Sequence, residues 1–238
     1  MALFGLFGGS KIDRMVKKLT NAWVQTQERQ RIMHVLSDIG SDEALFGLLK
    51  RFSYRTEQSI IDEDEKQMAL ALVVAAGPSA IPAIERYVAT YDRVYYPLKA
   101  LKEIAGIDVA VNLMLRVLDK AEDYDGRVNE QKNQLVSNLR DFKHPLIQER
   151  LLVLCEDESE EVRLKAIDAL STYGEEVALN AIAARILDEN ESPSVKAVLF
   201  EQLLEEGWSL SRWRGELLEA DILPAYYRLN KKGILERA

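Results

Sequence analysis

The sequence EEVRLKAIDALSTYG, residues 160–174, carries the pattern that decides the fold. Apolar side chains, among them Val162, Ala166 and Leu170, recur at intervals of three and four residues, which places them on one side of an α-helix. Acidic residues lie at its start, where they favour the positive end of the helix dipole. Gly174 follows, and we expect this glycine to form a left-handed C-cap. The stretch therefore predicts a helix that ends just before this glycine.

The same pattern recurs along the chain. Glycines close five such segments, at positions 40, 77, 106, 174 and 207, and Lys143 takes the place of the glycine in a sixth. The spacings between these positions are 37, 29, 37, 31 and 33 residues. Eight positions before each of them stands an apolar residue: Ile32, Ala69, Leu98, Leu135, Ala166 and Leu199. Self-similarity at this period predicts stacked helical hairpins, an α-solenoid.

Each unit predicts a helix A before the glycine position and a helix B after it. The expected pairs are 26–39 with 42–53, 63–76 with 79–91, 95–105 with 108–121, 128–142 with 145–155, 160–173 with 176–188, and 193–206 with 210–220. Further helices are expected over 11–24 and 224–230, and longer connections over 53–62 and 122–126. No linker composition interrupts the chain, so we expect one domain with three parts: an N-terminal apolar lead and amphipathic capping helix (1–25), a repeat array (26–220), and a C-terminal cap and basic tail (221–238).

Residues 161–170, EVRLKAIDAL, resemble a HEAT repeat, and Ser194-Val195-Lys196-Ala197 resembles the same element. The similarity is closest to the short bacterial type that also occurs in phycobilin lyases, and it extends over roughly residues 26–220. It implies an all-α fold, a right-handed α-solenoid of about six HEAT-like helical hairpins with terminal capping helices. It also implies that the B helices line the concave side. HEAT arrays serve many unrelated roles, so the resemblance implies a fold rather than a function.

The charge is distributed unevenly along the chain. The net charge is −8, yet residues 1–34 carry six basic and two acidic side chains, and residues 228–238 carry four basic and one acidic. An acidic body is a poor general nucleic-acid binder, because phosphate contacts dominate that affinity. We see no run of about 18 apolar residues, no secretory signal, and a single cysteine, Cys155, which cannot form an internal disulfide. These features predict a cytoplasmic protein.

Basic residues form a column in the A helices. Eleven positions before each glycine position stand Arg29, Lys66, Tyr95, Lys132, Arg163 and Lys196, and an acidic residue lies within the five preceding positions of each. One interpretation is a series of ion pairs that tie adjacent repeats together. The other is a ligand-binding role for the column. If these pairs are exposed, each contributes about 0–1 kcal/mol to stability.

The B helices carry a second basic series: Lys50, Arg86, Arg116, Arg150, Arg185 and Arg214. On the concave side that the resemblance implies, one cation per repeat makes a positive track that suits an acidic peptide or a phosphate backbone. The alternative is a set of solvated side chains, each paired with an acid of its own helix.

The first residues suggest three roles. An apolar lead, Leu3, Phe4, Leu6 and Phe7, precedes a basic amphipathic helix whose apolar face holds Ile12, Met15, Val16, Leu19 and Trp23. Such a helix can cap the open end of a solenoid. It can also lie on an anionic membrane or dock into a partner.

Aromatic residues gather at two further places. Trp208, Trp213, Tyr226 and Tyr227 lie near Arg212, Arg214 and Arg228, and Tyr87, Tyr91, Tyr95 and Tyr96 lie near Arg86 and Arg93. Aromatic and arginine side chains are typical of protein interfaces. They equally suit a terminal cap in the first case and packing between repeats in the second.

Catalysis finds little support in the sequence. His34 and His144 lack the following glutamate with which HEAT-repeat hydroxylases hold iron, and Cys155 follows an apolar run typical of a buried, inert thiol. We predict no catalytic residues, no metal and no cofactor. The predicted function is a non-enzymatic protein-binding scaffold or adaptor that uses the concave surface of the solenoid and its aromatic C-terminal end. An acidic segment is one candidate for what it binds in a protein partner. Its candidate binding residues are Arg86, Arg116, Arg150, Arg185, Trp208, Trp213, Arg214, Tyr226 and Tyr227.

Three other functions remain open at this point. They are nucleic-acid binding, including a HEAT-like alkylpurine DNA glycosylase, peripheral membrane attachment through the N-terminal helix, and a chaperone that resembles the tetrapyrrole lyases. The glycosylases resemble this chain in length and architecture, but no motif matches residue by residue.

Overall fold

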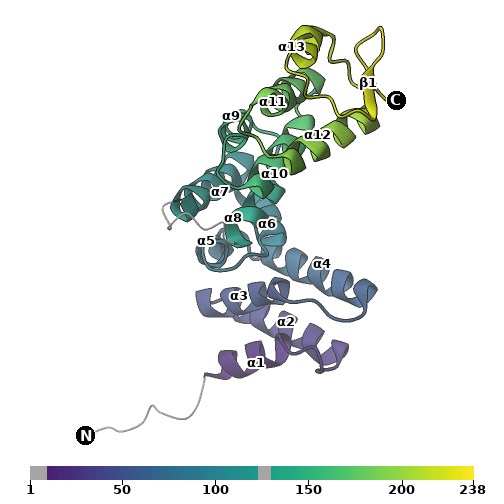
Figure 1. Ribbon diagram of the computed structural model, residues 1–238. Helices are drawn as coiled ribbons and strands as arrows, with labels where there is room; N and C mark the ends of the chain where they lie inside the picture. The colour runs from purple at the N-terminus through teal and green to yellow at the C-terminus, as the bar shows by residue number, and fades with distance from the viewer. Residues whose placement is uncertain (1–9, 123–129) are drawn as a thin grey trace, which may run out of the picture. The chain divides into compact units, whose positions relative to one another are not determined.

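The computed structural model describes residues 10–122 and 130–238, and the chain divides into two compact units, residues 1–138 (unit 1) and 139–238 (unit 2). Helices make up almost all of the regular structure in this part of the chain (Figure 1). The expectation of an all-α solenoid is confirmed. The apolar lead at residues 3–7 and the connection at 122–126 lie outside the described residues, apart from the last residue of one helix.

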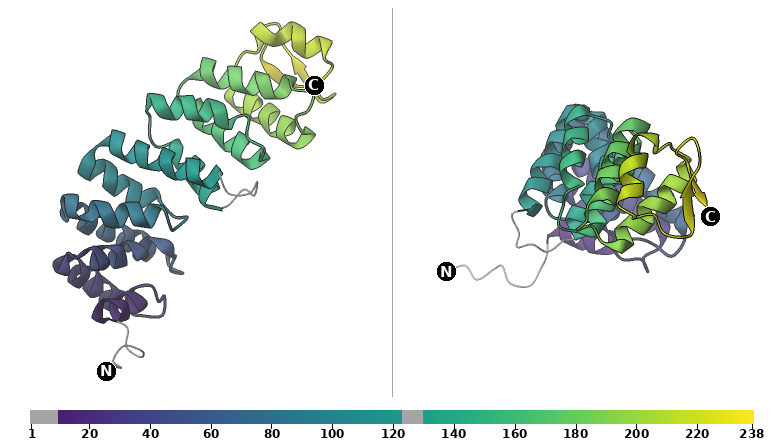
Figure 2. Two further views of the ribbon diagram at one scale, coloured as in Figure 1. Left: turned by 90° about the vertical axis from the view of Figure 1, so that its left-hand side faces the viewer. Right: turned by 45° about the horizontal axis from the view of Figure 1, so that its top comes forward.

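Unit 1 is a two-layered stack of helices. Its elements are α1 (Lys11–Leu19), α2 (Thr26–Ile39), α3 (Asp42–Leu49), η1 (Lys50–Ser53), α4 (Ser59–Ala75), η2 (Gly77–Ala80), α5 (Ile81–Val88), α6 (Tyr95–Ala105), α7 (Ile107–Glu122) and α8 (Glu130–Leu139). The A helices α2, α4 and α6 contact one another in order, and so do the B helices α3, α5 and α7. Figure 2 shows this stack running from purple to teal.

The core lies between the two layers. The apolar position eight residues before each glycine is buried in every repeat: Ile32, Ala69, Leu98, Leu135, Ala166 and Leu199. From the B layer of unit 1, side chains such as Leu48, Ile84 and Met114 are wholly buried. Burying a side chain of this size contributes on the order of 1.5–3 kcal/mol. The hydrophobic pattern thus predicted the core correctly.

Helix α1 covers the first repeat. It contacts α2 and α3, and Leu19 is wholly buried. A Cβ atom at Gly47 would lie 2.5 Å from Cγ2 of Val16, so the close approach of α1 to α3 requires glycine there. The apolar face of α1 therefore packs against the protein itself, which supports the cap interpretation.

Helix α1 ends earlier than predicted, at Leu19 rather than residue 24. The Thr20 hydroxyl donates to the carbonyl of Val16, and the Asn21 side chain accepts the backbone N–H of Trp23. These local bonds compete with the helix and turn the chain. Trp23 consequently does not share the buried face, and 88% of it is exposed.

Unit 2 holds α9 (Pro145–Leu154), α10 (Glu160–Ser171), α11 (Glu175–Leu187), α12 (Pro193–Glu206), η3 (Ser211–Trp213) and α13 (Arg214–Glu219). Helix α10 contacts α9, α11 and α12, and α11 contacts α12. The left-handed C-cap predicted for Gly174 is wrong, although Gly40 and Gly207 do form such caps. Tight turns end α10 at Ser171, and Gly174, with φ 122° and ψ 157°, is instead the N-cap of α11.

The helix predicted over residues 224–230 is also wrong. The chain forms a hairpin of β1 (Tyr227–Leu229) and β2 (Leu235–Arg237), which pair antiparallel with Leu229 opposite Leu235. Asn230 makes the turn, because its side-chain oxygen accepts the backbone N–H groups of Lys232 and Ile234. The hairpin packs on α12 and closes unit 2.

Among the described residues, no single helix has both the length and the apolar composition that crossing a bilayer requires. The pair α4 and η2–α5 meets that test only when taken together, and it bends by 114° at the break.

Candidate partner-binding site

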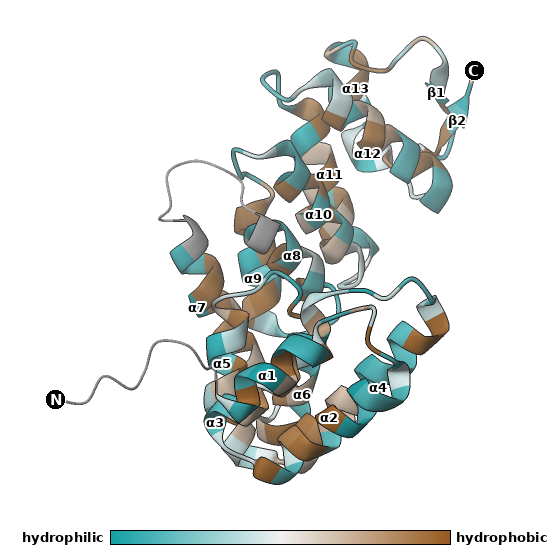
Figure 3. Ribbon diagram, turned by 90° about the horizontal axis from the view of Figure 1, so that it is seen from below, coloured by the Kyte–Doolittle hydropathy of each residue, from teal (hydrophilic) through white to brown (hydrophobic). Residues whose placement is uncertain are grey.

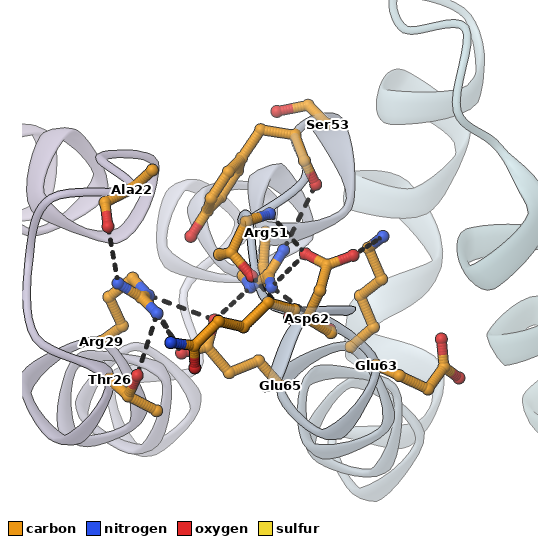
Figure 4. Close-up of polar contacts among 12 residues, drawn as sticks. Ala22, Thr26, Arg29, Arg51, Ser53, Asp62, Glu63 and Glu65 are labelled. Atoms are coloured by element: carbon orange, nitrogen blue, oxygen red, sulfur yellow. Dashed lines mark hydrogen bonds and ion pairs between the residues drawn. The ribbon is translucent and has the colours of Figure 1, made fainter. Parts of the chain in front are cut away.

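A chain of buried charges links the first two repeats of unit 1 (Figure 4). Its members, Arg29, Arg51, Asp62, Glu65 and Lys66, are each less than a tenth exposed. We call them the charge cluster. Burying a charge costs several kcal/mol unless partners compensate it, so every contact in the cluster matters for its stability.

Arg29 on α2 and Glu65 on α4 form the first link. The Arg29 Nη2 atom lies 2.8 Å from Glu65 Oε1, and Nε donates to both carboxylate oxygens at 3.0 and 3.2 Å. The remaining donors of Arg29 reach the carbonyls of Ala22 and Val24 and the Thr26 hydroxyl. One guanidinium thus ties the start of α2 to the next repeat.

Arg51 on η1 extends the cluster. Its Nε donates to Glu65 Oε2 at 2.7 Å, and its Nη2 donates to Asp62 Oδ1 at 2.8 Å and to the Asp62 carbonyl at 3.2 Å. Its guanidinium also lies 4.5 Å from the centre of the Tyr54 ring. Arg51 therefore joins helix α4 to the end of the first helix B, with its own side chain wholly buried.

Asp62 closes the cluster. Its Oδ2 lies 2.5 Å from Lys66 Nζ, and its Oδ1 accepts the backbone N–H of Thr56 at 2.9 Å. Burial alone would raise the pKa of Asp62, but the hydrogen bonds from Lys66, Arg51 and Thr56 lower it to about 2. Asp62 is therefore a carboxylate at neutral pH, and it fixes the connection between η1 and α4.

A cavity of about 620 Å³ opens beside this connection. We call it the tyrosine pocket. Its lining is Phe52, Ser53, Arg55, Lys66, Tyr91, Asp92, Arg93, Val94, Tyr95, Tyr96, Gln134 and Asn138. Residues of η1, the connection after it, α4, the α5–α6 connection, α6 and α8 contribute to it, and all of them belong to unit 1.

Stacked rings form the apolar part of the tyrosine pocket. Phe52 and Tyr96 stack with ring centres 5.1 Å apart and planes 8° apart, and Tyr95 meets Tyr96 edge-on. The Tyr96 hydroxyl donates to Glu63 at 2.6 Å. Burial and this bond raise the pKa of Tyr96, so it stays a neutral donor. The rings are thus held in place before any partner binds.

The pocket is positively charged. Arg55, Arg93 and Lys66 line it, against one acid, Asp92. Lys66 is held by Asp62, whereas Arg55 and Arg93 are exposed at the surface. Cations beside a partly enclosed, weakly screened surface attract carboxylate or phosphate groups.

The ion pairs in the structure distinguish between the two interpretations of the basic column in the A helices. Arg29 binds Glu65 of the next repeat, and Arg163 binds Glu191 at 2.5 and 2.9 Å, just before the next helix A. Lys66 instead binds Asp62 of its own helix. Ion pairing between repeats is confirmed for Arg29 and Arg163.

The basic series of the B helices is paired as well, but mostly with the preceding repeat. Arg86 lies 2.7 Å from Asp42, Arg116 lies 2.9 Å from Glu85, and Arg185 lies 2.7 Å from Glu156. Arg150 is also engaged with other residues. A partner binding this series would have to share or displace these carboxylates. That these four arginines bind a partner stays a prediction.

The aromatic residues near the C-terminus belong to the cap of unit 2. Tyr227 is 6% exposed, its ring lies 5.8 Å from that of Phe200, and its hydroxyl bonds Glu201. Arg214 donates to the carbonyl of Asn230 at 2.6 Å. Trp208 and Trp213 are partly exposed, and Tyr226 is 59% exposed. Their role in binding a partner also stays a prediction.

Sequence reasoning found only part of the candidate site. It noticed the tyrosines and Arg93, but it grouped them with Arg86, and it did not single out Phe52, Arg55 or Asp62. The signal was the unusually long connection over 53–62, which brings Asp62 into the charge cluster and Arg55 into the lining of the pocket. Pairing across this connection has no sequence period, so no repeat pattern reveals it.

Residues 129–203 match the family model for HEAT repeats. This segment is about a third of the chain. No curated protein and no solved structure shows a significant match to the chain.

Proposed function

We propose that this chain, whose residues 129–203 match HEAT repeats, is a non-enzymatic scaffold that binds an acidic segment of another protein in its tyrosine pocket. HEAT repeats usually serve as protein-interaction scaffolds. The observation that carries the proposal is the pocket itself, which combines three cations, one acid and three tyrosines in about 620 Å³.

The chemistry of the pocket favours an acidic segment with an apolar or aromatic side chain. Arg55 and Arg93 supply charge that a partner carboxylate can neutralise, while Tyr95 and the Phe52–Tyr96 stack supply an apolar surface. Tyrosine and arginine carry much of the binding energy at protein interfaces. A cavity of this size accepts a few side chains, so the partner would present a short segment rather than a flat surface.

The charge cluster supports this site by fixing its walls. It holds η1, the connection after it and α4 in one arrangement. A prearranged site loses less conformational entropy on binding. The arginines predicted earlier in unit 1, such as Arg86 and Arg116, and the aromatic residues of the unit 2 cap, such as Tyr226, remain two further proposed surfaces for the same partner class.

Site-specific photo-crosslinking tests the proposal. A photoreactive phenylalanine replaces Tyr95, which is 41% exposed in the pocket, or Tyr226, which is 59% exposed in the C-terminal cap. Val198, 50% exposed on α12, is the matched control position. We expect one defined protein adduct in the native cytoplasm from position 95, identified by mass spectrometry. An adduct from position 226 alone would move the site to the cap, and none at either position would contradict the scaffold.

Charge reversal then tests the electrostatic part. Arg55→Glu with Arg93→Glu should abolish the adduct at position 95, because the pocket would repel an acidic segment. Lys231→Glu with Lys232→Glu, at exposed positions outside the pocket, is the matched control and should leave it intact. Equal yields from both double variants would show that the segment is not recognised by its charge.

A further inference from the structure

A second charged cavity lies at the opposite end of unit 1, on the outer side of α1 and α2. It measures about 590 Å³ and is lined by Lys11, Arg14, Met15, Lys18, Glu28, Arg31, Ile32 and Val35. We call it the basic groove. Figure 3 views the structure from this side, and most of α1 appears teal, that is, hydrophilic.

The cations of the basic groove are only partly neutralised. Glu28 is its one acid, and it lies 3.3 Å from both Lys18 and Arg31. Within residues 10–122 and 130–238, no acidic side chain forms an ion pair with Lys11 or Arg14. Both are exposed, as is Lys17 on the same helix. The groove therefore carries an excess of positive charge that faces solvent.

An exposed tryptophan stands beside these two helices. Trp23 lies in the connection between α1 and α2 and is 88% exposed, the largest exposed fraction among the described large apolar side chains. Tryptophan is enriched at membrane surfaces, where its ring is buried among headgroups and its N–H meets water. The turn that ends α1 leaves Trp23 exposed, and its side chain lines a separate cavity with Arg55 and Gln58.

The uneven distribution of charge along the chain favours one orientation of the protein toward an anionic surface. Residues 1–34 carry a net charge of +4, while the full chain carries −8. An anionic surface would repel most of the protein and attract this end. Such a distribution selects one orientation of approach.

From these observations we propose that the basic groove docks the protein on an anionic phospholipid membrane, with Trp23 exposed in the connection between the two helices that line the groove. The cations would contact lipid phosphates and carboxylates, and the partly exposed Met15 and Val35 would meet the adjoining apolar part of the lipid. Insertion of α1 is not part of the proposal, because Val16 and Leu19 are occupied against α3 and the core. Docking would therefore be reversible and sensitive to salt.

Flotation of the full chain with vesicles tests this proposal. Vesicles of phosphatidylcholine alone are compared with vesicles that also contain phosphatidylserine. We expect binding to the anionic vesicles only, and its loss near 1 M salt, where the screening length falls to about 3 Å. Lys11→Gln with Arg14→Gln should weaken binding by about 25-fold, since each cation near an anionic surface contributes about fivefold.

Two controls keep the outcome specific. Lys231→Gln with Lys232→Gln removes the same charge at another exposed place and should leave binding unchanged. An environment-sensitive fluorophore on Met15→Cys should change its emission on anionic vesicles, whereas one on Val198→Cys should not. Cys155 is buried, so labelling stays selective.

Three results would overturn membrane docking. The first is equal flotation with neutral and anionic vesicles. The second is a larger loss from the control pair than from the groove pair. The third is sedimentation showing that the groove variant abolishes self-association without lipid, because the occupant would then be a second copy of this chain.

Discussion

Unit 1 and unit 2 each use an arginine of a helix A to bind the following repeat, Arg29 in unit 1 and Arg163 in unit 2. In both, an arginine of helix A binds a glutamate near the next helix A and donates to backbone carbonyls just before its own helix. In unit 2 the arrangement is nearly complete with this pair, since Arg185 adds only a distant contact at 3.9 Å. In unit 1 Arg51, Asp62 and Lys66 extend the pair into a cluster.

This comparison identifies the place where the repeat array departs from its regular pattern, the connection between η1 and α4. In unit 2 the corresponding place between helix α10 and the start of α12 holds the ion pair Arg163–Glu191. The larger cluster of unit 1 instead holds an irregular connection, and the tyrosine pocket lies beside that connection. The helix starts differ too: the side chains of Ser159 and Ser192 cap α10 and α12, whereas the N-cap residues of α2 and α4, Gln25 and Gln58, form no side-chain cap.

The largest difference in stability between the two units should appear when the glutamate of each pair is replaced. Glu65→Gln leaves both Arg29 and Arg51 buried without their carboxylate, so the free energy of unfolding should fall by about 3–5 kcal/mol. Glu191→Gln should cost about 2 kcal/mol, because Arg163 keeps its backbone partners. Urea denaturation followed by circular dichroism measures both. Equal losses would show that the cluster adds nothing beyond the shared pair.

Acid should weaken unit 1 through Asp62. The pKa of Asp62 is about 2 in the folded protein against 3.8 as an ordinary value, so its stabilisation is present above the ordinary pKa and is lost as the pH falls toward 2. The loss should amount to about 2 kcal/mol between about pH 5 and pH 2. Hydrogen exchange of the α4 amides across this range measures it. Asp62→Asn should flatten the dependence, and an unchanged slope in that variant would assign the effect to other carboxylates.

Removing a serine cap should affect unit 2 alone. The Ser192 hydroxyl accepts the backbone N–H of Val195 at 3.2 Å. Ser192→Ala should lower the free energy of unfolding by about 1 kcal/mol. Thermal melting monitored by the fluorescence of Trp208 and Trp213 reports this unit. Ser211→Ala is the control, because Ser211 is not the N-cap of a helix.

Adding a cap should stabilise unit 1 by the smallest amount. The backbone of Gln25 has φ −57° and ψ 140°, a conformation that suits an N-cap. Gln25→Ser should raise the free energy of unfolding by about 0.5–1 kcal/mol, because a hydroxyl could then accept an unpaired N–H of α2. If urea denaturation shows instead that this variant has a lower free energy of unfolding, the Gln25 side chain already stabilises this turn.

The repeated elements were predictable because their cause is periodic. The apolar column containing Ile32 and Leu199 is set by helix geometry, so spacing alone located the core. The hairpin at 227–237 was missed because Tyr227, Leu229 and Asn230 also fit a short helix, and only packing on α12 decides between the two. The tyrosine pocket was missed because Arg55, Tyr95 and Gln134 come from three separated segments. The cytoplasmic location of the protein and the class of its partner stay predictions.

The ion pairs between repeats have opposite senses in the two helical layers. In the A layer the cation belongs to the earlier repeat and the acid to the later one, as in Arg29–Glu65 and Arg140–Asp168. In the B layer the order reverses, as in Arg86–Asp42 and Arg116–Glu85. The partners do not stand at equivalent positions from repeat to repeat, since Asp42 lies two residues after Gly40 and Glu85 eight residues after Gly77. Exchanging or duplicating a helix pair would therefore break ion pairs in both layers, so these contacts fix the order in which the repeats follow one another.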